Sequence, residues 1–78
     1  MVNRSDIRRG MGECVHSIHR RDWNLLNKFL KERDFQSMIE IVESIYNKLD
    51  PEDEEDKIIS LVDLRNVIVE YKEYIDGE

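Results

Sequence analysis

The chain has 78 residues, of which 40% are apolar and 38% are charged, and it carries a formal net charge of −6. A chain of this length suits one domain with a small core, and so many apolar residues argue against a disordered protein. A single proline and three glycines leave too few turn residues for an all-β fold, so a helical fold is favoured.

Residues 5–20 predict a first helix, which Ser5 or Asp6 can cap at its N-terminus. Its apolar residues recur every three or four positions and therefore share one face of a helix. They are Ile7, Met11, Val15 and Ile18. The basic residues 19–21 then lie at the C-terminal end, where the helix dipole favours positive charge.

Two glycines, Gly10 and Gly12, interrupt this first apolar pattern. Each weakens a helix by up to ~1 kcal/mol relative to alanine, so they indicate either frayed turns or the close approach of a neighbouring helix. Cys14 lies beside the apolar stripe, and we interpret it as a small buried hydrophobic residue.

Residues 22–32 and 34–49 predict a second and a third helix, separated by a break at Arg33–Asp34. The break follows from the apolar spacing, because one continuous helix would place Asp34 in the core. Both helix starts show the same order of residue types: a basic end, an Asp cap and an aromatic first residue. The two junctions are Arg21-Asp22-Trp23 and Arg33-Asp34-Phe35.

Residues 51–75 predict a long fourth helix, which stops near Gly77. Asp50 can cap it, Pro51 suits its first position, and the acids that follow face the positive end of the helix dipole. Its main apolar stripe has a three-and-four spacing, which from Leu61 onwards is also the heptad spacing of coiled coils. The stripe comprises Ile58, Leu61, Leu64, Ile68, Tyr71 and Ile75.

Together these segments predict an all-α fold, a small compact bundle of about four helices with a long C-terminal helix. We expect residues 1–78 to form a single domain. Its predicted core comprises Trp23, Leu26, Phe29, Leu30, Phe35, Met38, Val42, Ile45, Leu61, Leu64 and Ile68.

Part of the chain resembles a single tetratricopeptide helix pair with its trailing proline. The matching residues are Trp23-Asn24-Leu25, Arg33-Asp34-Phe35 and Leu49-Asp50-Pro51. Met38 and Ile45 stand where that family has small residues at its helix crossings, and Arg33 stands where it has a turn glycine. The resemblance covers about thirty residues and one repeat, so it implies a shared helix hairpin rather than membership of that family.

Residues that could bind a metal lie close together between Glu13 and Asp22, with Cys14, His16 and His19 among them. Glu13 and His16 form one Glu-x-x-His element, whereas di-metal bundles need two such elements and further inward glutamates. A zinc site would need paired ligands or three ligands that converge. Cys14 and His16 are two apart, so on a helix they point in different directions and cannot form a catalytic pair. We therefore expect no metal site, no cofactor and no enzyme activity.

Charge is distributed unevenly along the chain. Residues 1–33 hold eight Lys or Arg against four acids, whereas residues 34–78 hold four against fourteen. The two halves can attract each other in the folded domain, or either can meet a partner of opposite charge. One alternative function, a small nucleic-acid-associated regulator, would use the arginines of the first half. These are Arg8, Arg9, Arg20 and Arg21, and the acidic pI of about 4.9 argues against this alternative.

We expect the chain to bind another protein, as a regulatory module of the adaptor or inhibitor kind. The last helix carries a second apolar band, and its start is acidic, so both features can meet a partner. The predicted partner residues are Val62, Val69, Tyr74, Glu52, Asp53 and Glu55. A homodimer through residues 58–75 is one form of such binding, and an acidic inhibitor that mimics a nucleic acid is a further alternative.

The sequence also predicts where the protein works. No apolar run is long enough to span a membrane, and the first residues lack an apolar secretory segment. A single cysteine cannot form an internal disulfide. We therefore expect a cytoplasmic protein without membrane contact.

Overall fold

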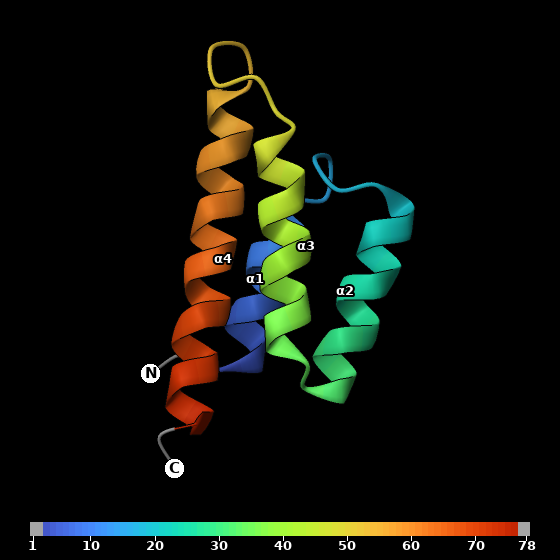
Figure 1. Ribbon diagram of the computed structural model, residues 1–78, viewed down its shortest axis with the longest axis vertical. Coiled ribbons are helices and arrows are strands. Elements are labelled where there is room, and N and C mark those ends of the chain that lie inside the picture. Colours follow the sequence, from blue (N-terminus) through green and yellow to red (C-terminus); the bar gives the residue numbers. More distant parts are fainter. Residues whose placement is uncertain (1–2, 77–78) are drawn as a thin grey trace.

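Four helices make up most of the computed structural model, which describes residues 3–76 (Figure 1). They are α1 (Arg4–Glu13), α2 (Arg20–Glu32), α3 (Phe35–Asn47) and α4 (Glu55–Asp76). The structure therefore confirms the all-α prediction, including a last helix that is longer than the others. No helix within residues 3–76 combines the length and apolar character needed to cross a lipid bilayer.

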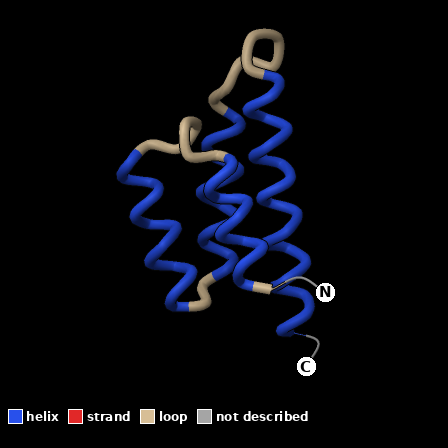
Figure 2. Tube along the Cα trace, turned by 180° about the vertical axis from the view of Figure 1, so that it is seen from behind, coloured by secondary structure: helices blue, strands red, loops and turns tan. Residues whose placement is uncertain are grey.

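The helices α3 and α4 form a central antiparallel pair, and each packs against one further helix (Figures 1 and 2). α1 packs against α4, and α2 packs against α3. Among the described residues, the backbone of α2 approaches only that of α3, whereas α1 and α3 both approach α4. α3 and α4 are therefore the centre of the bundle, and α1 and α2 are its outer helices.

One apolar core connects all four helices. Most of the predicted core is buried, namely Leu26, Leu30, Phe35, Met38, Val42, Leu61, Leu64 and Ile68. The other three predicted residues, which are only partly buried and pack at its edge, are Trp23, Phe29 and Ile45. The core also contains Ile7, Met11, Cys14, Ile18 and Ile39.

α1 ends at Glu13, so the prediction of a helix over residues 5–20 is wrong at its C-terminal end. The glycines weaken the last turns, which lowers the cost of ending the helix there. Cys14 and Ile18 reach the core from the segment that follows, with 1% and 7% exposure. Val15, which a continuous helix would place in the apolar stripe, is instead 45% exposed.

His19, Arg20 and Arg21 lie at the start of α2, not at the C-terminus of α1 as predicted. His19 is the N-cap residue, but its side chain caps no backbone N–H. Positive charge is unfavourable there because the N-terminal end of the helix dipole is positive. Asp22 is not the cap that the repeated junction predicted, since α2 already begins at Arg20, but it offsets part of this charge in the first turn.

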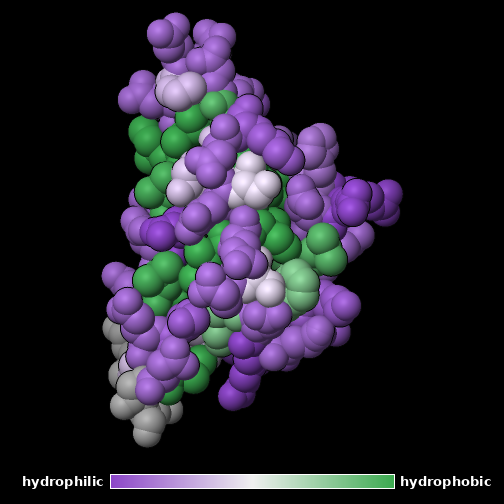
Figure 3. All heavy atoms as spheres, viewed as in Figure 1, coloured by the Kyte–Doolittle hydropathy of each residue, from purple (hydrophilic) through white to green (hydrophobic). Residues whose placement is uncertain are grey.

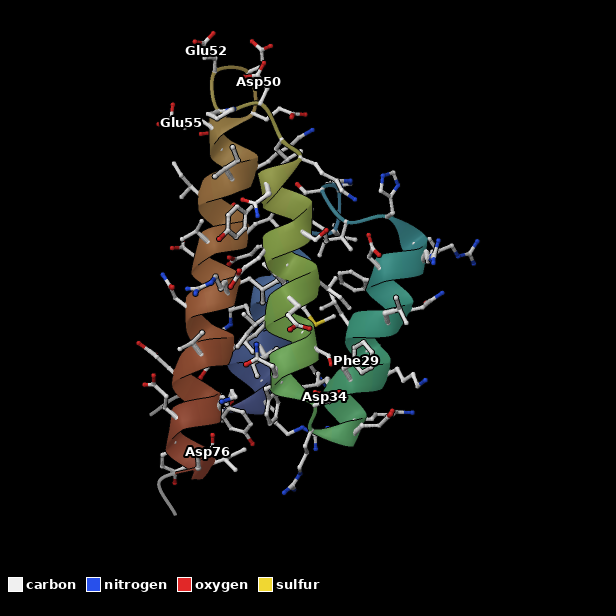
Figure 4. All side chains as sticks on the ribbon, viewed as in Figure 1. Phe29, Asp34, Asp50, Glu52, Glu55 and Asp76 are labelled. Atoms are coloured by element: carbon white, nitrogen blue, oxygen red, sulfur yellow. The ribbon has the colours of Figure 1, made fainter. Side chains whose placement is uncertain are left out.

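The predicted break between the second and third helices is confirmed at Arg33 and Asp34. Arg33 takes the left-handed conformation, with φ 59° and ψ 30°, in which glycine is usual at a helix end. The Asp34 carboxylate accepts hydrogen bonds from the Ser37 N–H at 3.3 Å and from the Ser37 hydroxyl at 2.7 Å. This short capped turn holds α2 and α3 side by side as a hairpin (Asp34, Figure 4).

The two glycines of α1 differ in their surroundings. A Cβ added at Gly10 would lie 3.0 Å from the Leu64 Cδ1 atom of α4, whereas one added at Gly12 would meet nothing within 4 Å. The sequence left two explanations for these glycines, and the structure supports close approach of a neighbouring helix at Gly10. The absence of a side chain there allows α1 to lie directly on α4.

α4 begins at Glu55, later than the predicted start at residue 51. The acids before it close a turn instead of the first helical turn. The Asp50 carboxylate accepts from the Glu52 N–H at 2.9 Å, and the Glu54 carboxylate accepts from the Asp50 N–H at 3.0 Å. These side chains satisfy local backbone groups in a turn, which moves the regular helix towards the C-terminus.

The heptad stripe of α4 faces the interior of the bundle. Its members are Leu61, Leu64, Ile68, Tyr71 and Ile75, and all are buried or pack against the core. The Tyr71 ring also meets Phe35 of α3 edge-to-face, with ring centroids 5.1 Å apart. A dimer through this stripe would have to displace α1 and α3. The predicted helix stop at Gly77 lies outside the described residues.

Candidate functional site

An open apolar groove lies between α2 and α3, on the face shown in Figure 3. Its volume is about 380 Å³, and part of its floor is the Phe29 ring, which is labelled in Figure 4. The lining residues are Asp22, Leu25, Phe29, Ser37, Glu40, Ile41, Ser44, Ile45 and Lys48. We call this feature the α2–α3 groove.

The apolar part of the α2–α3 groove follows from helical spacing. Leu25 and Phe29 are four apart on α2, and Ile41 and Ile45 are four apart on α3, so each pair lies on one side of its helix. All four side chains are partly buried. Phe29, Ile41 and Ile45 pack against the core with part of their surface, and the rest faces the groove. The apolar face of each helix is therefore wider than the part that packs against the core.

Basic residues of α2 border the groove, outside its lining. The Lys28 Nζ lies 6.0 Å from the centroid of the Phe29 ring, at the edge of the apolar floor. Arg20 and Arg21 line hollows that adjoin the groove at Leu25. Within residues 3–76, none of these three cations and no other basic residue of α2 takes part in an ion pair.

The α3 side of the groove is neutral to acidic over most of its length. Ser37, Glu40 and Ser44 form its polar edge, and Lys48 follows the C-terminal end of α3. Asp22 is the one acid that α2 contributes to the lining. The two sides of the groove therefore differ: on α2 the cations Arg21 and Lys28 border a lining that contains Asp22, and on α3 the lining is polar with Glu40.

The structure separates the six predicted partner residues. The acids Glu52, Asp53 and Glu55 are exposed, and Glu52 and Glu55 lie at the extreme end of α4 and its preceding turn (Figure 4). Val62 and Val69 are partly buried on one flank of α4. The other apolar residue of the predicted band, Tyr74, is 43% exposed. It follows Val69 by five residues, which turns it by about 140° around the helix, so the predicted band is not one surface.

The four arginines of the nucleic-acid alternative also lie apart. Arg8 lines a hollow with Trp23 between α1 and α2. Arg9 lies on another side of α1, in a hollow whose other charged residues are Asp6, Glu13 and Asp63. Arg20 and Arg21 lie at the start of α2. The structure therefore gives no single basic face that contains all four.

The candidate metal and nucleophilic residues are dispersed as well. In residues 3–76, no group of three or more His, Cys, Asp or Glu side chains could hold a metal ion. His16 and His19 are exposed, whereas Cys14 is buried. Burial, with smaller contributions from Glu13 and Asp63, raises the pKa of the Cys14 thiol from 9.0 to about 11. A thiol with this pKa is a poor nucleophile at neutral pH.

The α2–α3 groove is the feature that the sequence prediction missed. The sequence prediction places Phe29 and Ile45 in the core and gives Leu25 no place in it. The available signal was the excess of apolar residues beside each stripe, at Leu25 on α2 and at Ile41 on α3. Periodicity alone could not assign that excess, because it does not tell which side of a helix remains without a neighbour.

Comparisons of this chain with protein-family models, with curated proteins and with solved structures find no match.

Proposed function

We propose that the chain is a non-enzymatic module that binds another protein through the α2–α3 groove. The single observation that supports this most strongly is the groove itself, with four partly exposed apolar side chains and polar edges. Apolar surface that is rimmed by polar residues is typical of a protein-binding site.

The size of the groove is consistent with this role. A volume of about 380 Å³ can accept a few large side chains of a partner, which matches the way that helices dock in apolar grooves. Each large apolar side chain that becomes buried contributes ~1.5–3 kcal/mol, and a small number of such anchors dominates most interfaces. We also propose that the protein works in the cytoplasm, where a free, buried Cys14 remains reduced.

A capture experiment with a matched pair of variants tests the proposed function. Wild type, Ile41→Gln and Ile59→Gln are each immobilised and exposed to an extract of the cells that produce the protein. Ile41 lies in the groove, whereas Ile59 is 51% exposed on α4. Both variants replace one isoleucine with glutamine and leave the net charge unchanged. Circular dichroism confirms that both variants are folded.

We expect one or more proteins to bind wild type and Ile59→Gln but to be lost from Ile41→Gln. Equal capture by Ile41→Gln, or a loss confined to Ile59→Gln, would contradict the assignment of the groove. A purified captured protein should then bind wild type at least tenfold more tightly than Ile41→Gln in a titration.

A further inference from the structure

We infer that the ligand of the α2–α3 groove is an amphipathic helix that carries acidic residues along one flank, with that flank over α2. This inference rests on the proposed function, because it names the partner class of the same site. It follows from the shape of the groove and from the difference in charge between its two sides.

The shape of the groove favours a helix as the ligand. Leu25 and Phe29 form one row and Ile41 and Ile45 another, and each row follows the axis of its own helix. The two rows run side by side, because α2 and α3 form an antiparallel hairpin. A ligand helix lying along this channel would place its own i, i+3, i+4 and i+7 apolar residues between the rows.

The charges on the α2 side determine where acids of the ligand would lie. Lys28 borders the Phe29 ring, and Arg21 borders Leu25, so both cations are next to the apolar floor. Lys48 adds a third cation at the same end as Arg21, where the two cations share a hollow with Asp22, the acid of the α2 lining. Carboxylates on the flank of the ligand that faces α2 would meet cations that have no ion-pair partner within residues 3–76.

The α3 side gives the ligand an orientation. Glu40 would repel acids on that side, whereas Ser37 and Ser44 can hydrogen-bond to neutral polar groups. The acids of the ligand should therefore lie on one flank rather than on both. The net charge of the whole chain is −6 and would attract basic ligands in general, so a preference for acids must come from this local arrangement.

A selection from a displayed library tests this inference without a known partner. The library presents 18-residue alanine-based helices with random surface residues, and it is depleted on Ile41→Gln before selection on wild type. Because the depletion variant carries no added charge, it does not bias the selection towards acids. Recovered helices are synthesised with a fluorophore, and their binding is measured by anisotropy at low and at physiological salt.

Two charge reversals serve as a matched pair in these titrations. Lys28→Glu changes the α2 border of the groove, and Lys72→Glu makes the same net change at a partly exposed site on α4, where Lys72 pairs with Asp76. We expect the recovered helices to carry apolar anchors and acids along one flank. Lys28→Glu should weaken their binding about tenfold. Lys72→Glu should change their affinity less than twofold, and higher salt should weaken binding to wild type.

The outcomes separate the inference from the proposed function. Helices that depend on Ile41 but lack acids, or that bind Lys28→Glu as tightly as wild type, would overturn the acidic helix and leave the groove as a binding site. A selection that yields no binder to wild type would overturn both.

Discussion

α4 and α2 have opposite roles in this molecule. α4 is in contact with both α1 and α3, and its residues Leu61, Leu64 and Ile68 are at most 1% exposed. The backbone of α2 approaches that of α3 alone among the described helices, and α2 leaves Leu25 and Phe29 partly exposed. We therefore expect stability to depend mainly on α4, and we propose that recognition uses the surface of α2.

α4 and α2 also differ in the charges at their N-terminal ends. The acids at the start of α4 lie where the helix dipole favours them, and some of them also close the preceding turn. Arg20 and Arg21 lie at the start of α2, where the dipole opposes them. Their placement does not stabilise α2, which agrees with a role in binding a partner.

The largest expected effect separates the core of α4 from the surface of α2. Leu64→Ala should lower the free energy of unfolding by ~2–5 kcal/mol, because it removes a buried side chain and leaves a cavity. Leu25→Ala makes the same chemical change on a side chain that is partly exposed, and it should cost less than ~1 kcal/mol. Urea unfolding measures both values, and equal losses would contradict the distinction.

The contact between α1 and α4 gives the second prediction. Gly10→Leu should lower the free energy of unfolding by ~1–3 kcal/mol, because its side chain would overlap Leu64 and separate the helices. Gly12→Leu places the same side chain in open space and should be neutral or slightly stabilising, since leucine favours a helix over glycine. Equal losses of stability in the two variants would show that the close approach of α1 and α4 at Gly10 does not contribute to stability.

The third prediction concerns pH and the segment between α1 and α2. Because the pKa of Cys14 is raised from 9.0 to about 11, ionisation of the thiol favours the unfolded chain above pH 9. Its contribution to stability is complete below pH 9 and is lost as the pH rises towards 11. Between pH 8 and pH 10, wild type should therefore lose about 1.4 kcal/mol more than Cys14→Ala. Parallel unfolding curves at the two pH values measure this difference, and an equal loss in both proteins would contradict burial of the thiol.

The smallest effect is expected at the C-terminal end of α2. Arg33→Gly should raise the free energy of unfolding by ~0.5–1 kcal/mol, because glycine takes the left-handed conformation without the steric cost of a side chain. Arg33→Ala keeps that cost and serves as the control. A thermal melt in which glycine gives no gain over alanine would show that the turn is not strained.

The sequence predicted the parts of the fold that depend on local chemistry. The break at Arg33–Asp34 was predictable because a cap and a change in apolar register coincide there. The end of α1 was not predictable, because the apolar spacing continues from Met11 to Ile18 whether or not the chain stays helical. Only the bundle shows that Cys14 and Ile18 fill the core from a connecting segment.

The candidate site was less predictable than the fold for a related reason. Whether Phe29 is buried or lines a groove depends on which neighbour covers the flank of α2, and this is a property of the assembled bundle. The predicted partner residues Val62, Val69 and Tyr74 stay a prediction, but helix geometry divides them between two sides of α4, since Tyr74 points away from Val62 and Val69.

The most direct test of the central claim is an NMR titration of the isotope-labelled protein with a purified protein that wild type captures from the cell extract. We expect the methyl signals of Leu25, Ile41 and Ile45 and the ring signals of Phe29 to shift, while that of Ile59 on α4 stays unchanged. Shifts centred on Ile59 and Val62, with those of Leu25 and Ile41 unchanged, would show that recognition occurs on α4 and would contradict the division of roles between the two helices.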